Sequence, residues 1–340
     1  TVISALRKPA DNPDGPDHKR YITPNEFHQM AGRAGRRGID KIGYCFALCT
    51  NKSQKEKFDK LISTPSNNVE SHFNIDYSFV ANASELYSDR TQLKEIFRKS
   101  LQAFDKNPEV QYKNSKAMMT EFLRKEKILK EFGYIDSDNQ PTLKGKLLSE
   151  LNGYAQIPII DSITNGELFA LSPVQLAAYV AGLANIEDEQ RTSNPDKAKQ
   201  MPIELNIQDE TLQRMAERFN KRKFIYDYNI YKPIGKTIKY NTDAIEHIYA
   251  WADKNSRFKD STRNWRYMYY EYLKSSRTDE GKLFKEIMMT IDLLKQMDTI
   301  AQKGLELSEQ EKDIKYYSYL SDTIKASIDL LNRTPTQSNI

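Results

Sequence analysis

A short basic and glycine-rich stretch is the part of the sequence best suited to chemistry. Residues 29–40 read Gln-Met-Ala-Gly-Arg-Ala-Gly-Arg-Arg-Gly-Ile-Asp. Arg33 and Arg36 are three residues apart, so on one helical turn their side chains would point the same way. Two forked guanidinium groups aimed at one spot suit a polyphosphate, where negative charge builds up during phosphoryl transfer. Composition alone would also allow a basic surface loop, with glycines that permit tight turns.

The complete pattern resembles motif VI of superfamily 2 helicases, Gln-x-x-Gly-Arg-x-Gly-Arg-x-Gly. The variant in this chain is most similar to that of superkiller-type (Ski-like) DExH-box RNA helicases. The neighbouring residues add to the resemblance. Residues 21–27 are similar to the Tyr-x-x-Pro-x-Glu-Phe segment before motif VI, and residues 1–3 with 7–8 are similar to the end of motif V. Residues 43–48 are similar to the strand that follows motif VI.

Weaker similarities to the same family continue along the chain, in the family's order. They lie at residues 71–78, 100–104, 133–146 and 171–178. The last of these segments, Leu-Ser-Pro-Val-Gln-Leu-Ala-Ala, resembles the opening of the helical C-terminal domain of the family, called DSHCT. The shared order of these segments over most of the chain supports the assignment more than any one of them does.

The resemblance implies an ATP site between two RecA-like domains, of which this chain supplies the motif VI side. It implies that Gln29 contacts the γ-phosphate or its attacking water. Arg33 and Arg36 would contact the phosphates, with Arg36 as the arginine finger that stabilises charge in the transition state. Gly32 is expected at the same ATP site, where it and Gly35 would permit the tight turn. The implied cofactors are ATP and Mg²⁺, with the metal ion held by residues outside this chain.

The other half of such an ATP site is missing from the sequence. No Gly-x-x-x-x-Gly-Lys-Ser/Thr phosphate loop and no Asp-Glu-x-His motif occurs in the 340 residues. Together with a start in the middle of motif V, this predicts the C-terminal portion of a longer ATP-dependent 3′-to-5′ RNA helicase, inactive by itself. Two alternatives stay open: a non-catalytic nucleic-acid-binding or scaffolding module that kept the helicase fold, and a DNA helicase.

A long C-terminal helix is the expected grip on nucleic acid. The resemblance implies a ratchet helix along single-stranded RNA, and residues 281–297 are the candidate. Met288 and Met289 stand where the family places an Arg-Arg pair, so they could pack in the core or lie under bases, with the core favoured. The expected nucleic-acid contacts are the charged groups of this helix and the end of motif V: Lys285, Asp292, Lys295 and Thr1.

The spacing on this helix separates charged side chains from apolar ones. At about 100° per residue, Asp292 falls within about 20° of Lys285, and Lys295 within about 80° of it. The opposite side holds the residues expected in the core: Leu283, Ile287, Leu294 and Met297. An ordinary amphipathic helix with a solvated charged face would show the same pattern, so RNA contact and scaffold both stay open.

Composition and length limit the class of protein. The 340 residues, 39% hydrophobic and 29% charged, are enough for two or three domains with cores of their own. The net charge of +4 permits nucleic-acid binding without requiring it. No apolar run is long enough to span a bilayer, and no signal peptide opens the chain. Cys45 and Cys49 are expected as buried thiols in a reducing compartment, the cytoplasm or the nucleus.

The expected fold is multidomain and mainly α-helical. Residues 1–62 are expected to be the end of a second RecA-like α/β domain, residues 63–152 a winged helix, and residues 153–340 a helical DSHCT or ratchet-type bundle. The expected partners are single-stranded or 3′-tailed RNA, the first RecA-like domain of the same polypeptide, and RNA-decay machinery, with no membrane. Fewer than 30 residues separate Phe104 from Gly133, which leaves no room for the arch found in other family members.

Local patterns predict the elements of the first part. Thr23 as N-cap, Pro24 in the first turn and Glu26 at the capping-box position start a helix. This helix is expected to reach about Ala34, so that motif VI lies at its C-terminal end and in the turn beyond it. Residues 42–49 are apolar enough for a buried parallel strand.

The remaining patterns predict helices and one hairpin. Helical spacing of apolar residues predicts helices over 89–104 and 115–132, and a polar turn predicts a β-hairpin over 133–143. A charged loop is expected over 187–199. Further helices are expected over 173–184, 207–229, 242–253, 265–275, 280–303 and 308–332.

Overall fold

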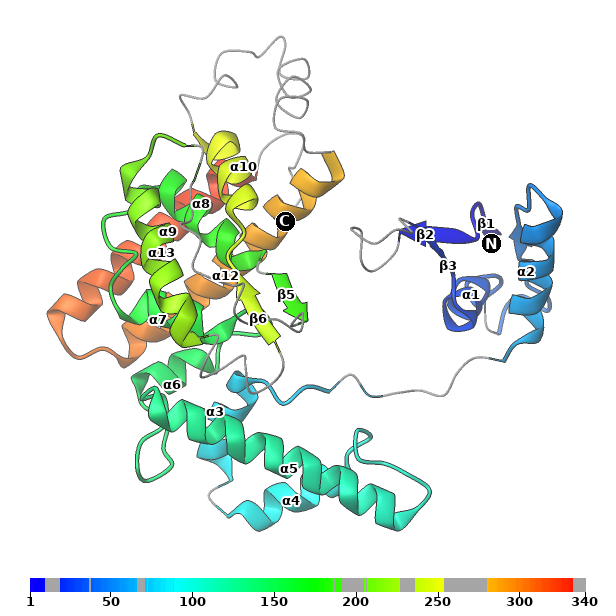
Figure 1. Ribbon diagram of the computed structural model, residues 1–340, viewed down its shortest axis with the longest axis horizontal. Helices are drawn as coiled ribbons and strands as arrows, with labels where there is room; N and C mark the ends of the chain where they lie inside the picture. Colours follow the sequence, from blue (N-terminus) through cyan, green and yellow to red (C-terminus); the bar gives the residue numbers. More distant parts are fainter. Residues whose placement is uncertain are drawn as a thin grey trace, which may run out of the picture. The chain divides into compact units, whose positions relative to one another are not determined.

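The computed structural model divides the chain into two units (Figure 1). The described residues are 1–9, 19–36, 38–65, 71, 73–87, 89–185, 187–190, 205, 207–226, 236–253 and 280–332. Unit 1 runs from Thr1 to His72 and unit 2 from Phe73 to Ile340. The described part is mainly helical with small two-stranded sheets. The helix expected over residues 265–275, and Arg37, lie outside the described residues.

Two strand pairs and two helices make up unit 1. Its elements in chain order are β1 (Val2–Ile3), β2 (Arg7–Pro9), β3 (Lys19–Tyr21), α1 (Pro24–Ala31), β4 (Phe46–Ala47) and α2 (Lys52–Ser63). β1 and β4 are parallel, whereas β2 and β3 are antiparallel. Parallel strands need a crossover connection, and here that connection contains α1. The buried side chains form one small core: Ile3, Leu6, Ile22, Phe27 and Leu61.

The strand after motif VI is parallel, as expected, but only one of its faces is covered. Cys45, Ala47 and Cys49 are half-buried and pack against the core of unit 1. The alternate side chains are apolar and 58 to 66% exposed: Tyr44, Phe46 and Leu48. The predictions of a buried strand and of buried thiols were therefore wrong. Side chains alternate across a strand, and the described residues cover only its inner face.

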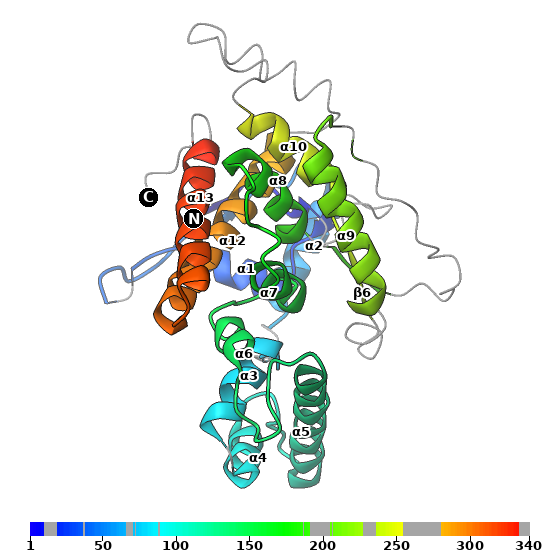
Figure 2. The same ribbon diagram turned by 90° about the vertical axis from the view of Figure 1, so that its left-hand side faces the viewer.

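Four helices and a tight turn form the first part of unit 2. They are α3 (Tyr77–Leu86), α4 (Arg90–Lys99), α5 (Pro108–Glu131) and α6 (Leu143–Leu148). α4 and α5 lie side by side (Figures 1 and 2). The β-hairpin expected over 133–143 was wrong in extent, because only Ile135 and Pro141 form an antiparallel bridge. The Asp136 carboxylate accepts two backbone hydrogen bonds within this turn, which closes it locally.

The second part of unit 2 is a bundle around α8. Its helices are α7 (Gln156–Thr164), α8 (Pro173–Ala184), α9 (Glu210–Tyr226), α10 (Thr242–Ala252), α12 (Glu280–Leu307) and α13 (Glu311–Leu331). α8 is buried on every side, since it packs against α9, α10, α12 and α13 (Figure 2). Its Gly182 makes room for Tyr240, whose ring atoms would lie 2.5 Å from an added Cβ. One hydrophobic core extends from α3 to α13.

The expected charged loop over 187–199 was wrong at its start. β5 (Glu187–Gln190) pairs antiparallel with β6 (Lys236–Lys239), so that Glu187 lies opposite Lys239. Because the partner strand is distant in sequence, local composition could not reveal this pairing. The other helices expected within the described residues are confirmed, with shifted ends.

Candidate functional site

A cluster of charges fixes the start of α1. Thr23 caps the helix, and Glu26 closes a capping box: the Thr23 amide donates to the Glu26 carboxylate at 2.8 Å, and the Glu26 amide donates to Thr23 Oγ1 at 3.3 Å. Arg20 donates two hydrogen bonds to the same carboxylate, at 2.8 and 2.9 Å, and Lys8 forms an ion pair with it. The Arg20 and Lys8 hydrogen bonds hold the pKa of Glu26 well below its usual range. The antiparallel β2–β3 pair is thereby anchored to the helix that leads into motif VI.

The end of α1 corrects one expectation about the motif VI arginines. The helix ends at Ala31 rather than near Ala34, and Gly32 caps it by donating to the His28 carbonyl at 2.8 Å. Arg33 and Arg36 therefore lie in the turn beyond the helix, and not on one helical turn as predicted. After Gly32 the Arg33 and Ala34 amides donate to the carbonyls three residues back, and Gly35, with a left-handed φ of +79°, then turns the chain away from a right-handed helix.

Close backbone packing holds the motif VI turn against the segment before β4. A Cβ added to Gly43 would lie 2.2 Å from the Ala34 carbonyl oxygen, and one added to Gly35 would lie 3.2 Å from Gly43 Cα. Only a residue without a side chain fits at position 43 in this arrangement. The turn that carries the two arginines is thus positioned by contact with the following strand segment as well as by α1.

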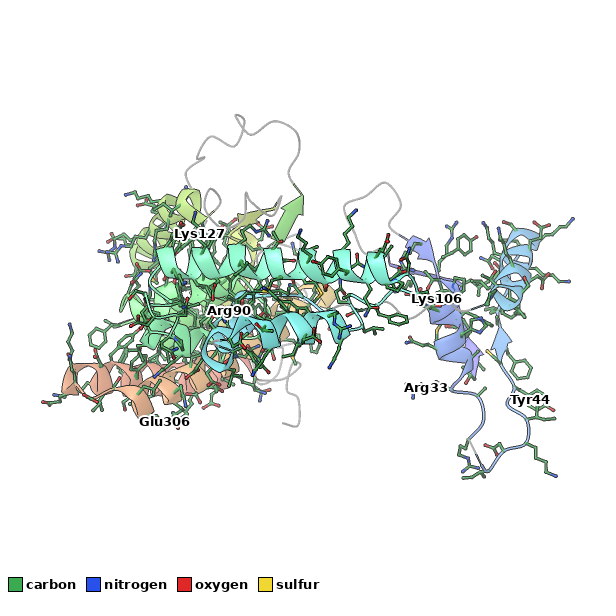
Figure 3. The ribbon with its side chains drawn as sticks, turned by 90° about the horizontal axis from the view of Figure 1, so that it is seen from below. Arg33, Tyr44, Arg90, Lys106, Lys127 and Glu306 are labelled. Atoms are coloured by element: carbon green, nitrogen blue, oxygen red, sulfur yellow. The ribbon has the colours of Figure 1, made fainter. Side chains whose placement is uncertain are left out.

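The side chains that were expected to contact ATP are all exposed. Gln29, Arg33 and Arg36 are open to solvent, and Figure 3 shows Arg33 beyond the end of α1. Arg33 makes no ion pair among the described residues. Asp40 accepts from the Arg36 backbone amide at 2.7 Å and from Arg36 Nε at 3.2 Å. Exposed guanidinium groups of this kind can reach a polyphosphate, and the exposed Arg36–Asp40 pair is weak enough to open for it.

The α12 helix separates its side chains as its spacing predicted. Leu283, Ile287, Leu294 and Met297 are fully buried, which confirms the expected core side. Lys285 and Lys295 are exposed and form no ion pair within the described part of the chain. Met288 and Met289 are half-buried, and Met289 packs against the core. Thr1, the fourth expected contact, is an exposed residue of unit 1 whose carbonyl accepts from the Phe46 amide at 2.9 Å.

Asp292 is exposed, but it is held by side chains that the sequence did not indicate. Its Oδ2 accepts from the Tyr154 hydroxyl at 2.7 Å and from Gln296 Nε2 at 3.2 Å. The Gln296 side chain in turn accepts from the Asn152 amide at 2.9 Å. Burial and the bond to Asp292 raise the pKa of Tyr154 above its usual range. The Asn-Gly dipeptide at 152–153 signals a turn, but nothing local signals its distant partner on α12.

A second buried pair joins α10 to α12 on the core side. His247 Nδ1 lies 2.7 Å from Glu286 Oε2, and both side chains are less than 10% exposed. Glu286 follows Lys285 directly, yet it faces the opposite way, into the bundle. The sequence showed a charged residue there without showing that it is buried. This pair positions α12 and is unavailable to a nucleic acid.

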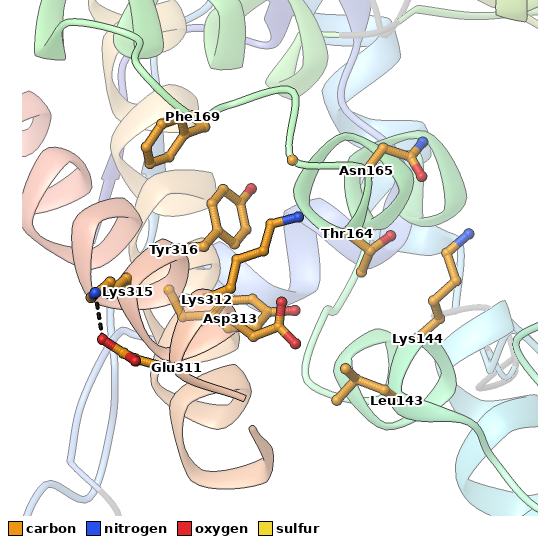
Figure 4. A pocket seen from close by; sticks show the side chains of 12 residues that line it. Leu143, Lys144, Thr164, Asn165, Phe169, Glu311, Lys312, Asp313, Lys315 and Tyr316 are labelled. Carbon is orange, nitrogen blue, oxygen red and sulfur yellow. Dashed lines mark ion pairs between the residues drawn. The ribbon is translucent and has the colours of Figure 1, made fainter. Parts of the chain in front are cut away.

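A cavity of about 1060 Å³ lies between the end of α7 and the start of α13 (Figure 4). Lys312 extends into it between Tyr316 and Thr164. The other cations nearby are matched by carboxylates: Lys144 lies 2.7 Å from Asp161, and Lys315 lies 2.5 Å from Glu311. Because its charges are mixed and largely paired, this cavity does not have the character of a phosphate site.

Comparison with known protein families assigns the chain to a family. A model of the DSHCT (NUC185) domain matches residues 138–315, just over half of the 340 residues. The chain belongs to the DSHCT family. The DSHCT match runs from the turn before α6 into α13 and includes Lys285, Asp292 and Lys295. It leaves out residues 29–40, for which motif VI is a resemblance carried by the sequence alone.

Curated relatives agree with the DSHCT assignment. The chain is 41% identical over 81 residues to the chloroplastic DExH-box ATP-dependent RNA helicase DExH15 of Arabidopsis thaliana, 24% of this chain and 6% of that protein. It is 30% identical over 92 residues to the antiviral helicase SKI2 of Saccharomyces cerevisiae, 27% of this chain and 7% of the relative. Superkiller complex protein 2 of Homo sapiens is 29% identical over 86 residues, which are 25% of this chain and 7% of that protein.

Over part of its length, the chain thus corresponds to the C-terminal part of Ski2-like DExH-box RNA helicases. The matched stretches span only 6 to 7% of the length of these relatives. Among the residues that the structure describes, no helix is both long and apolar enough to cross a membrane. Within the same residues, no cluster of three or more His, Cys, Asp or Glu side chains could hold a metal ion.

Proposed function

We propose that the chain is the C-terminal portion of an ATP-dependent 3′-to-5′ RNA helicase of the Ski2-like class. The observation that carries the proposal is the presence, in one chain, of a DSHCT domain and of a complete motif VI pattern whose arginines are exposed. A module that only scaffolds has no use for this arrangement of Gln29, Arg33 and Arg36. Their retention favours a catalytic role over the non-catalytic alternative.

The proposed domain division has three parts. Residues 1–62 would complete the second RecA-like domain, which the parallel β1–β4 pair with its α1 crossover supports. Residues 63–152 would form a winged helix, supported by α3–α5 followed by the bridged turn at Ile135 and Pro141. Residues 153–340 would form the ratchet-type helical domain, supported by the bundle around α8.

At the proposed ATP site, this chain acts through its motif VI turn. ATP and Mg²⁺ would be held mainly by the first RecA-like domain of the same polypeptide, and bound ATP would supply the phosphoryl group. Arg36 would release Asp40 and donate its hydrogen bonds to the phosphate oxygens, where it would stabilise the charge of the transition state. Arg33 adds a second positive charge, and Gln29 positions the attacking water. The backbone contact of Gly35 with Gly43 keeps the two arginines in place.

At the proposed RNA grip, α12 presents Lys285 and Lys295 to the phosphates of a single strand. Both are exposed, and lysines bind phosphate as point charges without reading sequence. Asp292 acts through Tyr154, by holding the α6–α7 connection to the helix. Thr1, at the end of motif V, would be a further contact for nucleic acid. RNA-decay machinery inside the cell is the proposed partner, and the human relative, superkiller complex protein 2, supports a partner that is a protein complex.

The test is a set of activity measurements on the full-length polypeptide. We expect ATP hydrolysis stimulated by RNA, and unwinding of RNA duplexes with a 3′ tail but not of duplexes with a 5′ tail. RNA binding without ATP hydrolysis would instead assign a non-catalytic module. Unwinding of DNA duplexes in preference to RNA would assign a DNA helicase. The chain of 340 residues alone, measured in parallel, should not hydrolyse ATP.

A further inference from the structure

The charged side chains of α5 fall into two groups on different sides of the helix. The inner group is paired and buried. Glu126 accepts from Ser84 Oγ at 3.1 Å and forms an ion pair with Arg90, whose guanidinium also lies over the Phe122 ring. Lys125 is 4% exposed and carries its own carboxylate partner on the preceding turn, 2.8 Å away. These inner charges join α5 to α3 and α4, so they belong to the fold.

The outer group is exposed and follows one stripe along the helix. At about 100° per residue, Tyr112, Lys116, Leu123, Lys127 and Lys130 fall within a sector of about 60°, which also holds Glu109 in the first turn of the helix. Lys113 and Glu131 lie beside this sector and are exposed as well. Tyr112 is 65% exposed, and the Lys127 side chain 79%. We call Tyr112, Lys113, Lys116, Leu123, Lys127 and Lys130 the α5 track.

The lysines of the α5 track are not used to hold the fold. Lys113 and Lys116 form no ion pair within the described residues. Lys127 lies 3.8 Å from Glu131 at the surface, and Lys130 donates to the Asn139 side chain in the adjoining turn. Surface contacts of this kind contribute little to stability. The positive charge is therefore available to a ligand.

The α4–α5 segment holds more than the whole net charge of the protein. Residues 90–131 contain eleven Lys or Arg against six Asp or Glu, a net charge of +5, whereas the full chain carries +4. Figure 3 shows Lys106 near one end of α5 and Lys127 towards the other, with Arg90 beside the helix. Phe104, in the connection before α5, is 61% exposed and adds a second aromatic ring near Tyr112 in sequence.

We infer that the α5 track binds single-stranded nucleic acid, as a second contact surface in addition to α12. The inference rests on the proposed function and extends it to a helix outside the ratchet. From Tyr112 to Lys130 the helix is about 27 Å long at about 1.5 Å per residue, enough for about eight stacked nucleotides at about 3.4 Å each. Lysines spaced along a helix follow a phosphate backbone, and Tyr112 offers a ring for base stacking.

The same face fits a protein partner less well. A helix-binding surface needs apolar residues at i, i+3, i+4 and i+7, but Leu123 is the single aliphatic residue of the α5 track. An acidic peptide would satisfy the lysines without using Tyr112. The aromatic and the lysines together therefore favour a polyanion that also carries flat bases.

The first test is charge reversal on the α5 track in the full chain. Lys116→Glu with Lys127→Glu should weaken binding of a fluorescein-labelled 20-nucleotide oligouridine at least roughly ten-fold. The plot of log affinity against log salt should become less steep by about 1.4, because two phosphate contacts are lost. The matched control is Lys312→Glu with Lys325→Glu on α13, which changes the net charge equally and should bind nearly as the wild type does. Circular dichroism confirms that each variant is folded.

The second test separates stacking from charge. Tyr112→Ala should weaken binding of the same RNA roughly five-fold or more while its salt dependence stays unchanged, because a stacking contact carries no counterion release. A 4-thiouridine in the RNA should cross-link to a peptide from residues 108–131. A purely structural role of Tyr112 would lower stability and leave the cross-link in place.

The outcomes distinguish this inference from the proposed function. If the α5 variants bind RNA as the wild type does, while Lys285→Glu with Lys295→Glu binds weakly, the α5 track is a solvated face and only this inference fails. An equal loss in the α13 control would likewise overturn it, because net charge alone would explain the effect. A wild-type chain that binds polyglutamate as tightly as RNA would assign the track to acidic proteins. A wild-type chain that binds no single strand would defeat the proposed function itself.

Discussion

The Tyr154 hydroxyl donates a 2.7 Å hydrogen bond to the Asp292 carboxylate, and this contact joins the α6–α7 connection to the middle of α12. Tyr154 and the preceding Gly153 both have left-handed backbone, with φ of +55° and +70°. That region is uncommon for a residue with a side chain, so the tertiary contact stabilises a local conformation that the chain would otherwise avoid. The α12 helix is thus held from its exposed side as well as from the core.

Removal of the Tyr154 hydroxyl should lower the stability of unit 2. Tyr154→Phe loses the bond to Asp292, and we expect a decrease of about 1 kcal/mol in the free energy of unfolding, since the pair is partly exposed. Denaturant unfolding followed by circular dichroism measures the change. Tyr112→Phe removes an exposed hydroxyl and serves as the matched control. An unchanged midpoint for Tyr154→Phe would show that the contact does not stabilise the connection.

Glu26 should make unit 1 sensitive to acid. Its pKa is lowered in the folded state by Arg20 and Lys8, so the stabilisation is present above its ordinary pKa of 4.5 and is lost as the pH falls through the folded value. We expect Glu26→Gln to destabilise unit 1 by about 1 kcal/mol at neutral pH. The variant should also show a weaker loss of stability below about pH 4.5 than the wild type does. Parallel acid titrations followed by circular dichroism would contradict this if the two curves had the same shape.

Gly43 should tolerate no side chain. In Gly43→Ala the new Cβ would meet the Ala34 carbonyl at 2.2 Å, so the motif VI turn must move, at a cost of about 1–3 kcal/mol. Gly32→Ala is the control for stability, because its Cβ would lie 3.1 Å from the nearest atom and its φ of −64° suits any residue. Thermal unfolding of both variants measures the difference. Equal stability of the two would argue against the packed turn.

Arg36→Ala in the full-length polypeptide should lower ATP turnover by roughly two orders of magnitude or more, with RNA affinity nearly unchanged. Arg36→Lys should fail as well, because a lysine cannot place two donors on neighbouring phosphate oxygens. Lys41→Ala removes a nearby exposed charge and should keep wild-type turnover. Steady-state hydrolysis assays with saturating RNA make the comparison. Normal ATP turnover in Arg36→Ala would contradict the assignment of Arg36 as the arginine finger.

Charge reversal on α12 tests the grip. Lys285→Glu with Lys295→Glu should reduce RNA-stimulated ATP hydrolysis and unwinding together, while basal hydrolysis and folding survive. Lys312→Glu with Lys325→Glu carries the same change of net charge on α13 and should leave both activities in place. RNA-stimulated ATP hydrolysis and duplex unwinding are measured on each variant. Full unwinding by the α12 variant would mean that the helix is scaffold and that the strand is held elsewhere.

The sequence predicted helices better than it predicted exposure. The core side of α12 followed from spacing alone, because a helix that packs on a bundle must repeat apolar residues every three or four positions. The strand around Phe46 was misjudged, since a run of apolar residues does not say whether one or both faces are covered. Burial depends on neighbours that lie elsewhere in the chain.

Side-chain partners were the least predictable feature of the candidate site. Charged residues at Asp292 and Glu286 look alike in the sequence, yet one bonds Tyr154 at the surface and the other bonds His247 in the core. The distinction depends on tertiary contacts 39 to 138 residues away. The early end of α1 was also missed, because the spacing of the motif does not show where the α-helical hydrogen bonds give way to the tighter turn at Arg33 and Ala34.

The packing of Gly43 against the motif VI turn has a consequence for how relatives diverge. If Arg33 and Arg36 serve ATP hydrolysis as proposed, a descendant that lost hydrolysis would be free to replace them. Position 43 is constrained by packing and not by a catalytic role, because a Cβ added there would collide with backbone atoms. A family member that has lost ATP hydrolysis should still have glycine at this position. That glycine would then indicate descent from a helicase even where the arginines of motif VI have been replaced.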